Sequence, residues 1–277
     1  PFKNEEYLIS INVKPEPNAI SGDLNAYFIS DNGSVSDQQV QIIAYDHIPI
    51  QTVLKPAKID LIKLKLIKVS SSIGYIEGAG DVIPDLLRHI GYEVSILDKD
   101  DVTVENLMQF DAVILGVRAF NTIDWLAYKN QELFDYSFEG GTVIVQYNTN
   151  RNLVTKNIAP YSLLLSRDRV SVETAPIRIL EPKHKLMNFP NKITMSDFDG
   201  WVQERGLYFC SEWDEKFIPI LSSNDPGESP KNGGLLVARH GEGYYIYSGY
   251  SWFRELPAGV EGAYRIFTNL ISVGEDS

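Results

Sequence analysis

Apolar and polar residues follow two different patterns along the chain, and the change between them divides the sequence. Over residues 1–70 the apolar residues form short runs, with prolines and the turn signal Asp31-Asn32-Gly33 between them. Runs rich in β-branched and aromatic side chains predict β-strands. We interpret residues 1–70 as a β-rich lead-in that is part of a β-sandwich. Its expected strands are Tyr7–Val13, Asn25–Ile29, Gln39–Tyr45 and Ile59–Leu66.

From residue 71 onward, short apolar strands alternate with helical patterns. Strand and helix in alternation at this spacing predict a parallel sheet with right-handed crossovers. We therefore expect residues 71–277 to form an α/β domain with a doubly wound parallel sheet. The expected strands are Ile73–Ile76, Tyr92–Leu97, Ala112–Leu115 and Thr142–Val145, and the expected helices are Val82–Ile90, Thr103–Met108, one within 122–138 and Gly262–Ile271. Leu235–Arg239 and Tyr244–Tyr247 are expected to form a hairpin.

Composition limits the partners. The chain has 277 residues, 44% of them hydrophobic, which is ample for a buried core. Its net charge of -12 repels phosphate backbones and anionic membrane surfaces, so we expect no nucleic-acid partner. No apolar run reaches the roughly 18 residues of a membrane span. Because the sequence begins with Pro1 and shows no signal peptide, we expect it to be part of a longer protein.

Polar residues follow three of the expected parallel strands. Ligands of open parallel sheets bind beyond the carboxyl ends of the strands, so the loops after Ile76, Leu115 and Val145 are where a crevice is expected. A doubly wound domain has polar loops there whether or not they bind a ligand, and both interpretations stay open. The loops are Glu77-Gly78-Ala79-Gly80-Asp81, Gly116-Val117-Arg118-Ala119-Phe120-Asn121-Thr122 and Gln146-Tyr147-Asn148-Thr149-Asn150-Arg151.

The first loop does not fit a dinucleotide site. Gly78-Ala79-Gly80 supplies two glycines and Asp98 ends the second strand, where an acid for the ribose would stand. However, Ile83 occupies the third glycine position, and Asp81 places a negative charge near the expected phosphates. We therefore expect no nucleotide cofactor.

Catalytic signatures are incomplete. A nucleophile elbow needs small residues around the nucleophile, but Ser251 in Gly249-Tyr250-Ser251-Trp252-Phe253 is followed by two bulky aromatics. The single cysteine, Cys210, has apolar neighbours and allows neither a disulfide within the chain nor a cysteine zinc cage. The histidines lack the spacing of a metal site; they are His47, His89, His184 and His240. We expect no catalytic residue and no metal ligand.

Tryptophans next to charged residues leave two interpretations open. They lie in Trp201-Val202-Gln203-Glu204-Arg205-Gly206, at Trp213 and in Ser251-Trp252-Phe253-Arg254. Carbohydrate sites pair an aromatic face with planar polar groups that bind hydroxyls. Core tryptophans beside ion pairs give the same pattern, and we favour the core interpretation.

Several long segments carry a family resemblance. They are Ile73–Asp81, Gly116–Thr122, Val145–Thr149, Trp201–Tyr208 and Leu256–Arg265. Over roughly residues 40–272 the chain resembles the C-terminal region of large bacterial PIG-L-like (N-acetylglucosaminyl-phosphatidylinositol de-N-acetylase-like) proteins. The resemblance implies a flavodoxin-like, class I glutamine amidotransferase-like domain that is akin to ThuA-like domains. It also implies an extracytoplasmic location.

The sequence departs from both families at their catalytic residues. The zinc site of the deacetylases lies on a His-Pro-Asp-Asp-type motif in an N-terminal domain, and no histidine here precedes a proline. The amidotransferases have a cysteine in the elbow after a central strand, where this chain has Gln146-Tyr147-Asn148-Thr149. Their histidine near the end of a late strand has no counterpart in Tyr247–Trp252.

Our leading hypothesis is a non-catalytic accessory domain of a longer PIG-L-like deacetylase-type protein. Its partners would be a glycan or sugar derivative and the N-terminal catalytic domain of that protein. The candidate ligand residues are Asp81, Arg118, Asn121, Asn148, Glu204 and Arg205. One alternative is a cryptic hydrolase or metal-dependent enzyme for a carbohydrate derivative, with Glu77, Asp81 and Glu204 converging in the crevice. Another is a structural domain that mediates oligomerisation.

Overall fold

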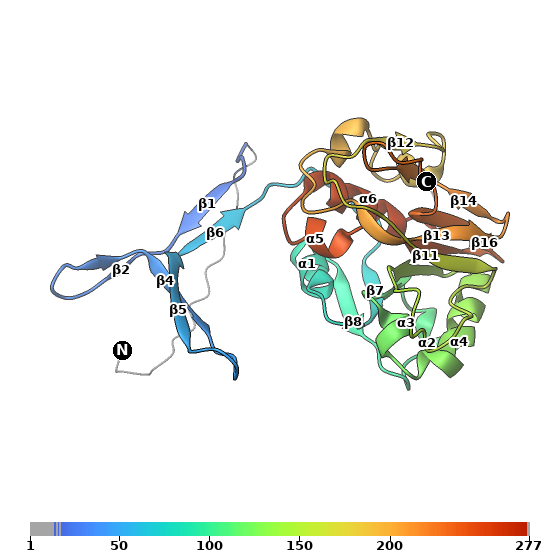
Figure 1. Ribbon diagram of the computed structural model, residues 1–277, viewed down its shortest axis with the longest axis horizontal. Helices are drawn as coiled ribbons and strands as arrows, with labels where there is room; N and C mark the ends of the chain where they lie inside the picture. Colours follow the sequence, from blue (N-terminus) through green and yellow to red (C-terminus); the bar gives the residue numbers. More distant parts are fainter. Residues whose placement is uncertain (1–13, 15, 17, 276–277) are drawn as a thin grey trace. The chain divides into compact units, whose positions relative to one another are not determined.

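A computed structural model describes residues 14, 16 and 18–275 of the chain (Figure 1). It divides after Lys65 into two compact units, Pro1–Lys65 and Leu66–Ser277. The expected strand Tyr7–Val13 lies outside the described residues.

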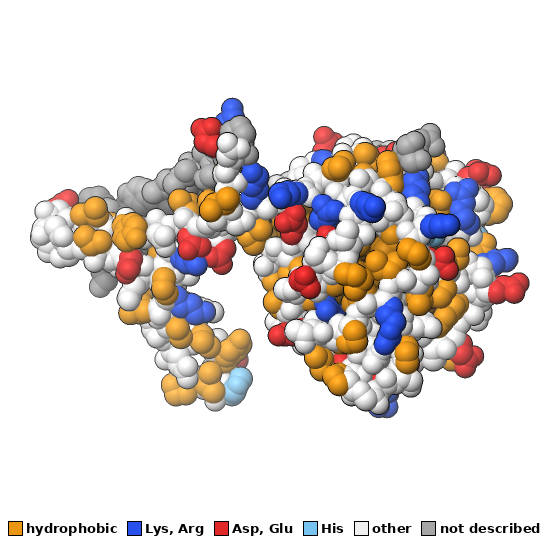
Figure 2. All heavy atoms as spheres, turned by 90° about the horizontal axis from the view of Figure 1, so that it is seen from above, with side chains coloured by type: hydrophobic (Ala, Val, Ile, Leu, Met, Phe, Trp, Pro, Cys, Tyr) orange, Lys and Arg blue, Asp and Glu red, His pale blue; other side chains and the backbone are white. Residues whose placement is uncertain are grey.

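The described residues of the first unit form three separate antiparallel strand pairs. They are β1 (Gly22–Asn25) with β6 (Lys58–Leu61), β2 (Phe28–Ile29) with β3 (Val35–Ser36), and β4 (Gln38–Ile43) with β5 (Gln51–Pro56). Hydrophobic side chains lie on the surface of these strands (Figure 2). Phe28 and Ile42 are among the exposed ones. The strand expected over 59–66 ends at Leu61, because β1 offers no partner residue beyond Gly22. That the unit belongs to a β-sandwich stays a prediction.

A seven-stranded sheet organises the second unit, in the order β14-β16-β17-β10-β9-β7-β8. Five strands are parallel: β7 (Ser72–Ile76), β8 (Glu93–Ile96), β9 (Ala112–Leu115), β10 (Thr142–Gln146) and β17 (Gly243–Ser248). In chain order these give the spatial order 2-1-3-4-5 of flavodoxin-like sheets, which confirms the expected fold class. Antiparallel β16 (Leu235–His240) and β14 (Phe217–Pro219) extend the sheet.

Strand β17 has a second role that the sequence pattern does not predict. The pattern predicts Tyr244–Tyr247 only as half of a hairpin, and the structure confirms the hairpin with β16. However, β17 also pairs with β10 as the fifth parallel strand. Its following loop, from Gly249 onward, is therefore a further loop at the carboxyl edge of the sheet.

Helices cover the sheet on both faces (Figure 1). They are α1 (Ile83–His89), α2 (Val104–Leu107), α3 (Ala119–Thr122), α4 (Leu126–Phe138), α5 (Trp252–Glu255) and α6 (Glu261–Ile271). Val143 and Val145 of β10 lie in one buried cluster with Leu133 and Phe134 of α4. Helix α6 contacts β10 as well. Each such buried side chain contributes about 1.5–3 kcal/mol, so the hydrophobic layers hold the domain together.

The ends of α1 follow from local chemistry. Gly91 directly follows the C-cap Ile90 and has φ +88°, the left-handed conformation in which glycine commonly ends a helix. The N-cap is Val82, and Asp81 directly precedes it. Asp81 still serves the helix from one position earlier, because its Oδ1 accepts a hydrogen bond from the Ile83 N–H at 3.0 Å.

Residues 151–235, which have no regular pattern in the sequence, contain short elements. These are β11 (Leu163–Val170) with β13 (Gly206–Trp213), β12 (Ile177–Ile179) with β15 (Leu221–Ser223), and the 3-10 helices Lys185–Met187 and Met195–Phe198. Within the described residues, no helix has the length and apolar character that crossing a membrane requires.

The loops after β7 and β9 touch through their backbones. Ala79 N–H donates to the Val117 carbonyl at 2.7 Å, and Gly116 N–H donates to the Ile76 carbonyl at 2.8 Å. A Cβ on Gly78 would lie 2.1 Å from the Val117 oxygen. Only glycine therefore allows this approach, and it brings the two loops together where a crevice was expected.

We predict that Gly78→Ala destabilises the second unit. The new methyl group would collide with backbone atoms that cannot move aside independently, at a cost of about 2 kcal/mol. Thermal unfolding followed by circular dichroism should show a midpoint lowered by roughly 4–8 °C. The matched control is Ala79→Ser in the same loop, because Ala79 is exposed. Equal midpoints for the two variants would contradict the proposed close contact.

Candidate functional site

Asp81 has its partners inside the fold. Its carboxylate accepts hydrogen bonds from the Tyr75 hydroxyl at 2.8 Å, from Ile83 N–H at 3.0 Å and from Val117 N–H at 3.2 Å. The Tyr75 hydroxyl in turn accepts from Gln146 Nε2 at 3.0 Å. Burial raises the pKa of Tyr75 well above its ordinary value, and the Asp81 charge adds to this. The carboxylate thus joins the loops after β7 and β9.

The two candidate asparagines are also bonded within the fold. Asn148 is fully buried; its Oδ1 accepts from Phe120 N–H at 2.9 Å and its Nδ2 donates to the Gln146 carbonyl at 2.9 Å. Asn121 Oδ1 accepts from Thr149 N–H at 2.8 Å, and its Nδ2 donates to backbone carbonyls of the same loop. These amides hold the loop after β10 against α3.

Arg205 lies in the core beside tryptophan. It is 5% exposed, its Nε donates to the Ala175 carbonyl at 3.1 Å, and its guanidinium lies 5.3 Å from the Trp201 ring centre. Trp201 and Trp252 are themselves buried and in contact, with ring centres 5.4 Å apart. The core interpretation is confirmed for these two tryptophans.

Half-buried aromatic rings meet beyond the ends of β10 and β17. Tyr147 and Tyr208 are stacked with ring planes 8° apart and centres 6.1 Å apart. The Phe253 ring lies 5.3 Å from Tyr147. Within the described chain, neither tyrosine hydroxyl has a hydrogen-bond partner. We call these three residues and the charged Arg118, Glu204 and Arg254 around them the tyrosine cluster.

Three charges act on the centre of the tyrosine cluster. Burial raises the pKa of Tyr147, the positive charges of Arg118 and Arg254 lower it, and the negative charge of Glu204 raises it. Glu204 and Arg254 form an ion pair at 2.9 Å, with side chains 14% and 34% exposed. The cluster therefore brings two of the predicted site residues, Arg118 and Glu204, together.

Backbone strain gathers at the same place. Four non-glycine residues of the described chain have a left-handed backbone, and three of them are Arg118, Gln203 and Tyr208, with φ of 59°, 67° and 53°. Gln203 is linked to the cluster because its side chain accepts a hydrogen bond from Arg254. Each such conformation costs on the order of 1–3 kcal/mol, and strain of this kind concentrates at functional sites.

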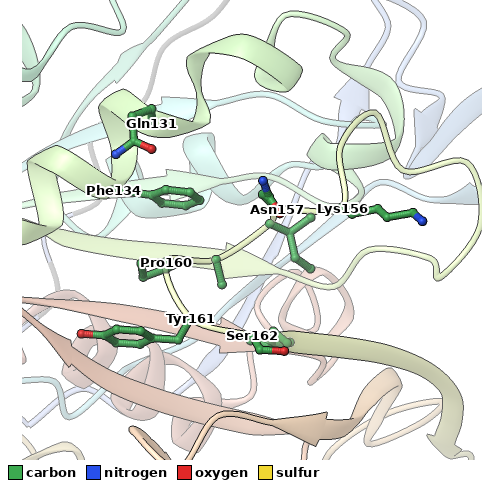
Figure 3. A pocket seen from close by; sticks show the side chains of 10 residues that line it. Gln131, Phe134, Lys156, Asn157, Pro160, Tyr161 and Ser162 are labelled. Atoms are coloured by element: carbon green, nitrogen blue, oxygen red, sulfur yellow. The ribbon is translucent and has the colours of Figure 1, made fainter.

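The larger hollows lie elsewhere. A pocket of about 460 Å³ opens between α4 and residues 156–163, with Gln131 and Phe134 on the helix and Asn157, Pro160 and Tyr161 on the facing segment (Figure 3). Tyr161 is already engaged, because its hydroxyl donates to the Arg239 carbonyl at 3.2 Å. The walls of this pocket carry no cluster of acids, bases and nucleophiles.

The groups that catalysis would need lie apart. Cys210 is 3% exposed, and burial raises the pKa of its thiol well above its usual value. Ser251 is fully buried. In the described residues no three His, Cys, Asp or Glu side chains form a group that could hold a metal ion, and Glu77, Asp81 and Glu204 form no such group.

Sequence reasoning does not find Tyr147, Tyr208 and Phe253 as site residues. Tyr147 stands in one of the three strand-end loops, but the sequence favours only its polar neighbours. Phe253 follows β17, which the sequence pattern predicts only as one strand of a hairpin. The loop after it is recognised as a strand-end loop of the parallel sheet only when its pairing with β10 is known. Recognition of the fifth parallel strand is the signal that could have found it.

Comparisons with known proteins concern the fold. No known protein family and no curated protein matches the sequence. Similar solved structures include a protein described as one chain of a GMP synthase from Thermoplasma acidophilum, with 12% identity, TM-score 0.49 and coverage of 74% of this chain and 94% of that chain. A ThuA-like protein from Bacteroides uniformis has 11% identity, TM-score 0.47 and coverage of 74% and 91%. PurLQS from Thermotoga maritima has 12% identity, TM-score 0.47 and coverage of 74% and 99%.

A ThuA-like protein is thus among the solved structures to which this chain is similar. At these identities the likeness concerns the fold alone. No comparison bears on the PIG-L part of the resemblance, which stays a prediction.

One buried acid is next in the chain to a residue of the tyrosine cluster. Glu255 is fully buried and directly follows Arg254; its Oε2 accepts from Val202 N–H at 2.9 Å, while Oε1 has no partner in the described chain. Burial raises the pKa of Glu255 to about 7, against the opposing charges of Arg205 and Arg254. The acid connects α5 to the segment that carries Glu204.

We predict that Glu255→Gln abolishes the fall in folding stability that the wild type shows as pH rises through 7. The folded state binds a proton at Glu255 up to a pKa of about 7, and the unfolded state only up to about 4.5. Stability contributed by the neutral acid is therefore present below pH 4.5 and lost as pH rises through 7, by up to about 3 kcal/mol. The variant should gain thermal stability over the wild type at pH 8 and little at pH 4.5.

The control is Glu139→Gln, which removes one exposed carboxylate at the end of α4. Its stability difference from the wild type should not change between the two pH values. A Glu255→Gln difference that is the same at pH 4.5 and pH 8 would show that folding does not raise the pKa of Glu255.

Proposed function

We propose that this chain is a non-catalytic glycan-binding domain and that its ligand binds at the tyrosine cluster. The observation that carries the proposal is the pair of stacked, half-buried rings of Tyr147 and Tyr208, whose hydroxyls have no partner in the described chain. Sugar C–H faces pack on aromatic rings, and sugar hydroxyls bind planar charged groups such as the Glu204–Arg254 pair. One surface therefore offers both aromatic rings for stacking and a charged pair for bidentate hydrogen bonds.

Binding fits the cluster better than catalysis does. The nearest candidates for a nucleophile, Ser251 and Cys210, are buried. The carboxylate of Glu204 is already paired with Arg254 at 2.9 Å. A domain of this kind would increase the time that a catalytic part of a longer protein spends near its glycan.

The family resemblance supports a more specific setting. We propose that the longer protein is of PIG-L-like deacetylase type, that its catalytic domain is the domain partner of this chain, and that it acts in an extracytoplasmic compartment. The residues of the zinc motif of that family are absent from this sequence. Deacetylation by the longer protein would thus depend on residues outside this chain.

We predict that Tyr208→Ala weakens glycan binding by about 30-fold. Loss of one stacked ring removes buried apolar area and a contact between rings, which together contribute about 2 kcal/mol to the binding free energy. Affinity electrophoresis against a panel of soluble neutral and acidic polysaccharides identifies a ligand, and calorimetry with oligosaccharides of that ligand then measures the change. Tyr208→Phe keeps the ring and should lose much less affinity.

The matched control is Tyr128→Ala on α4, since that tyrosine is 66% exposed and lies outside the cluster. It should bind like the wild type, and all variants should have similar melting temperatures. If the wild type bound none of the polysaccharides, or if Tyr208→Ala bound as well as Tyr128→Ala, the glycan proposal would be wrong.

A further inference from the structure

We infer that the glycan is acidic, and that Arg118 binds a sugar carboxylate beside the stacked tyrosines. The inference rests on the proposed function and adds the ligand class to it. It starts from an asymmetry in the tyrosine cluster. Two arginines act on Tyr147, but only one of them is paired with an acid.

The guanidinium of Arg118 has no partner within the described chain. It takes part in no ion pair or side-chain hydrogen bond, and its Nε is buried without an acceptor. A buried donor left unpaired is costly, and each one in a native structure calls for an explanation. The buried Nε itself lies out of reach of a ligand, but Arg118 is only half-buried, and an acceptor oxygen of a ligand can pair with the accessible end of its guanidinium.

Arg254 does not compete for the same anion. Glu204 neutralises it at 2.9 Å, and its guanidinium also lies 4.8 Å from the Phe253 ring centre. The charge that remains uncompensated beside Tyr147 is therefore that of Arg118. A neutral sugar would leave it unpaired, whereas a carboxylate matches the forked donors of a guanidinium.

The backbone holds Arg118 beside Tyr147. Its N–H donates to the Tyr147 carbonyl at 2.8 Å, and its own carbonyl accepts from the Thr122 hydroxyl at 3.1 Å. These bonds maintain a left-handed conformation with φ 59° that a non-glycine residue adopts at a cost. The backbone from which this long cationic side chain extends is therefore held beside Tyr147 before any ligand arrives.

The net charge of the chain selects among acidic ligands. At -12, the protein repels extended polyanions such as nucleic acids through its whole field. A short acidic sugar makes one charge contact and brings few charges into that field. The chemistry therefore favours a uronic-acid-type residue within an otherwise hydroxyl-rich glycan.

The test compares acidic oligosaccharides with their uncharged counterparts. The probes are the disaccharides of galacturonan, alginate and hyaluronan, which carry only one or two carboxylates, each alongside its methyl ester, which keeps the sugar and removes the charge. Calorimetry should show the wild type binding at least one acid about tenfold or more tighter than its ester. Added salt should reduce the preference.

Variants assign the preference to Arg118. Arg118→Gln should remove the difference between acid and ester while the ester binds as before, and Arg118→Lys should restore only part of it. Arg167→Gln is the control, because it removes an exposed arginine of β11 and one positive charge. It should keep the wild-type preference.

Three outcomes overturn the inference. Equal binding of acid and ester by the wild type would mean a neutral glycan and would leave the glycan proposal intact. An unchanged preference in Arg118→Gln would place the carboxylate elsewhere. Absence of binding to every acidic and neutral polysaccharide would reject both the inference and the proposed function.

Discussion

The arrangement of polar residues in the α/β unit depends on one contact, the approach of the loop after β7 to the loop after β9. Gly78 makes the approach possible, and Asp81 joins the loops by accepting from Tyr75 and from the Val117 backbone. Sheets with the order 2-1-3-4-5 bind ligands at this switch point. Here backbone and buried side chains occupy it, so polar residues that would line a crevice serve as internal connections.

The same strand order offers a second place for a site. Since β17 lies next to β10, the loops that follow these strands meet at the carboxyl edge of the sheet. Strand β13 can join them because Gly206 and Gly249 have no side chains; a Cβ on Gly206 would lie 2.4 Å from the Gly249 oxygen. Tyr147, Tyr208 and Phe253 thus come from three segments that are distant in sequence.

The periodicity of the sequence is sufficient for the parallel strands β7 to β10 and for most helices, because their apolar runs are local. It cannot show that β17 pairs with β10, since a parallel pairing leaves no mark on a short strand that also forms a hairpin. For the same reason it does not single out the aromatic residues near the end of that strand. Asp81 and Asn148 are predicted correctly as strand-end residues, but sequence does not reveal whether a polar side chain is already bonded within the fold.

A polar side chain that is already hydrogen-bonded within the fold differs in physical terms from one that is free to bind a ligand. Both ends of the Asn148 amide are bonded within the fold, so a ligand could bind it only by breaking contacts whose loss leaves buried groups unpaired. Arg118 lies on the neighbouring loop and has no such bonds to lose. A ligand that pairs with it gains a charge-assisted bond without an equal loss. The capacity for recognition therefore lies with the groups that the fold leaves unpaired, and in this edge of the sheet they gather around Tyr147.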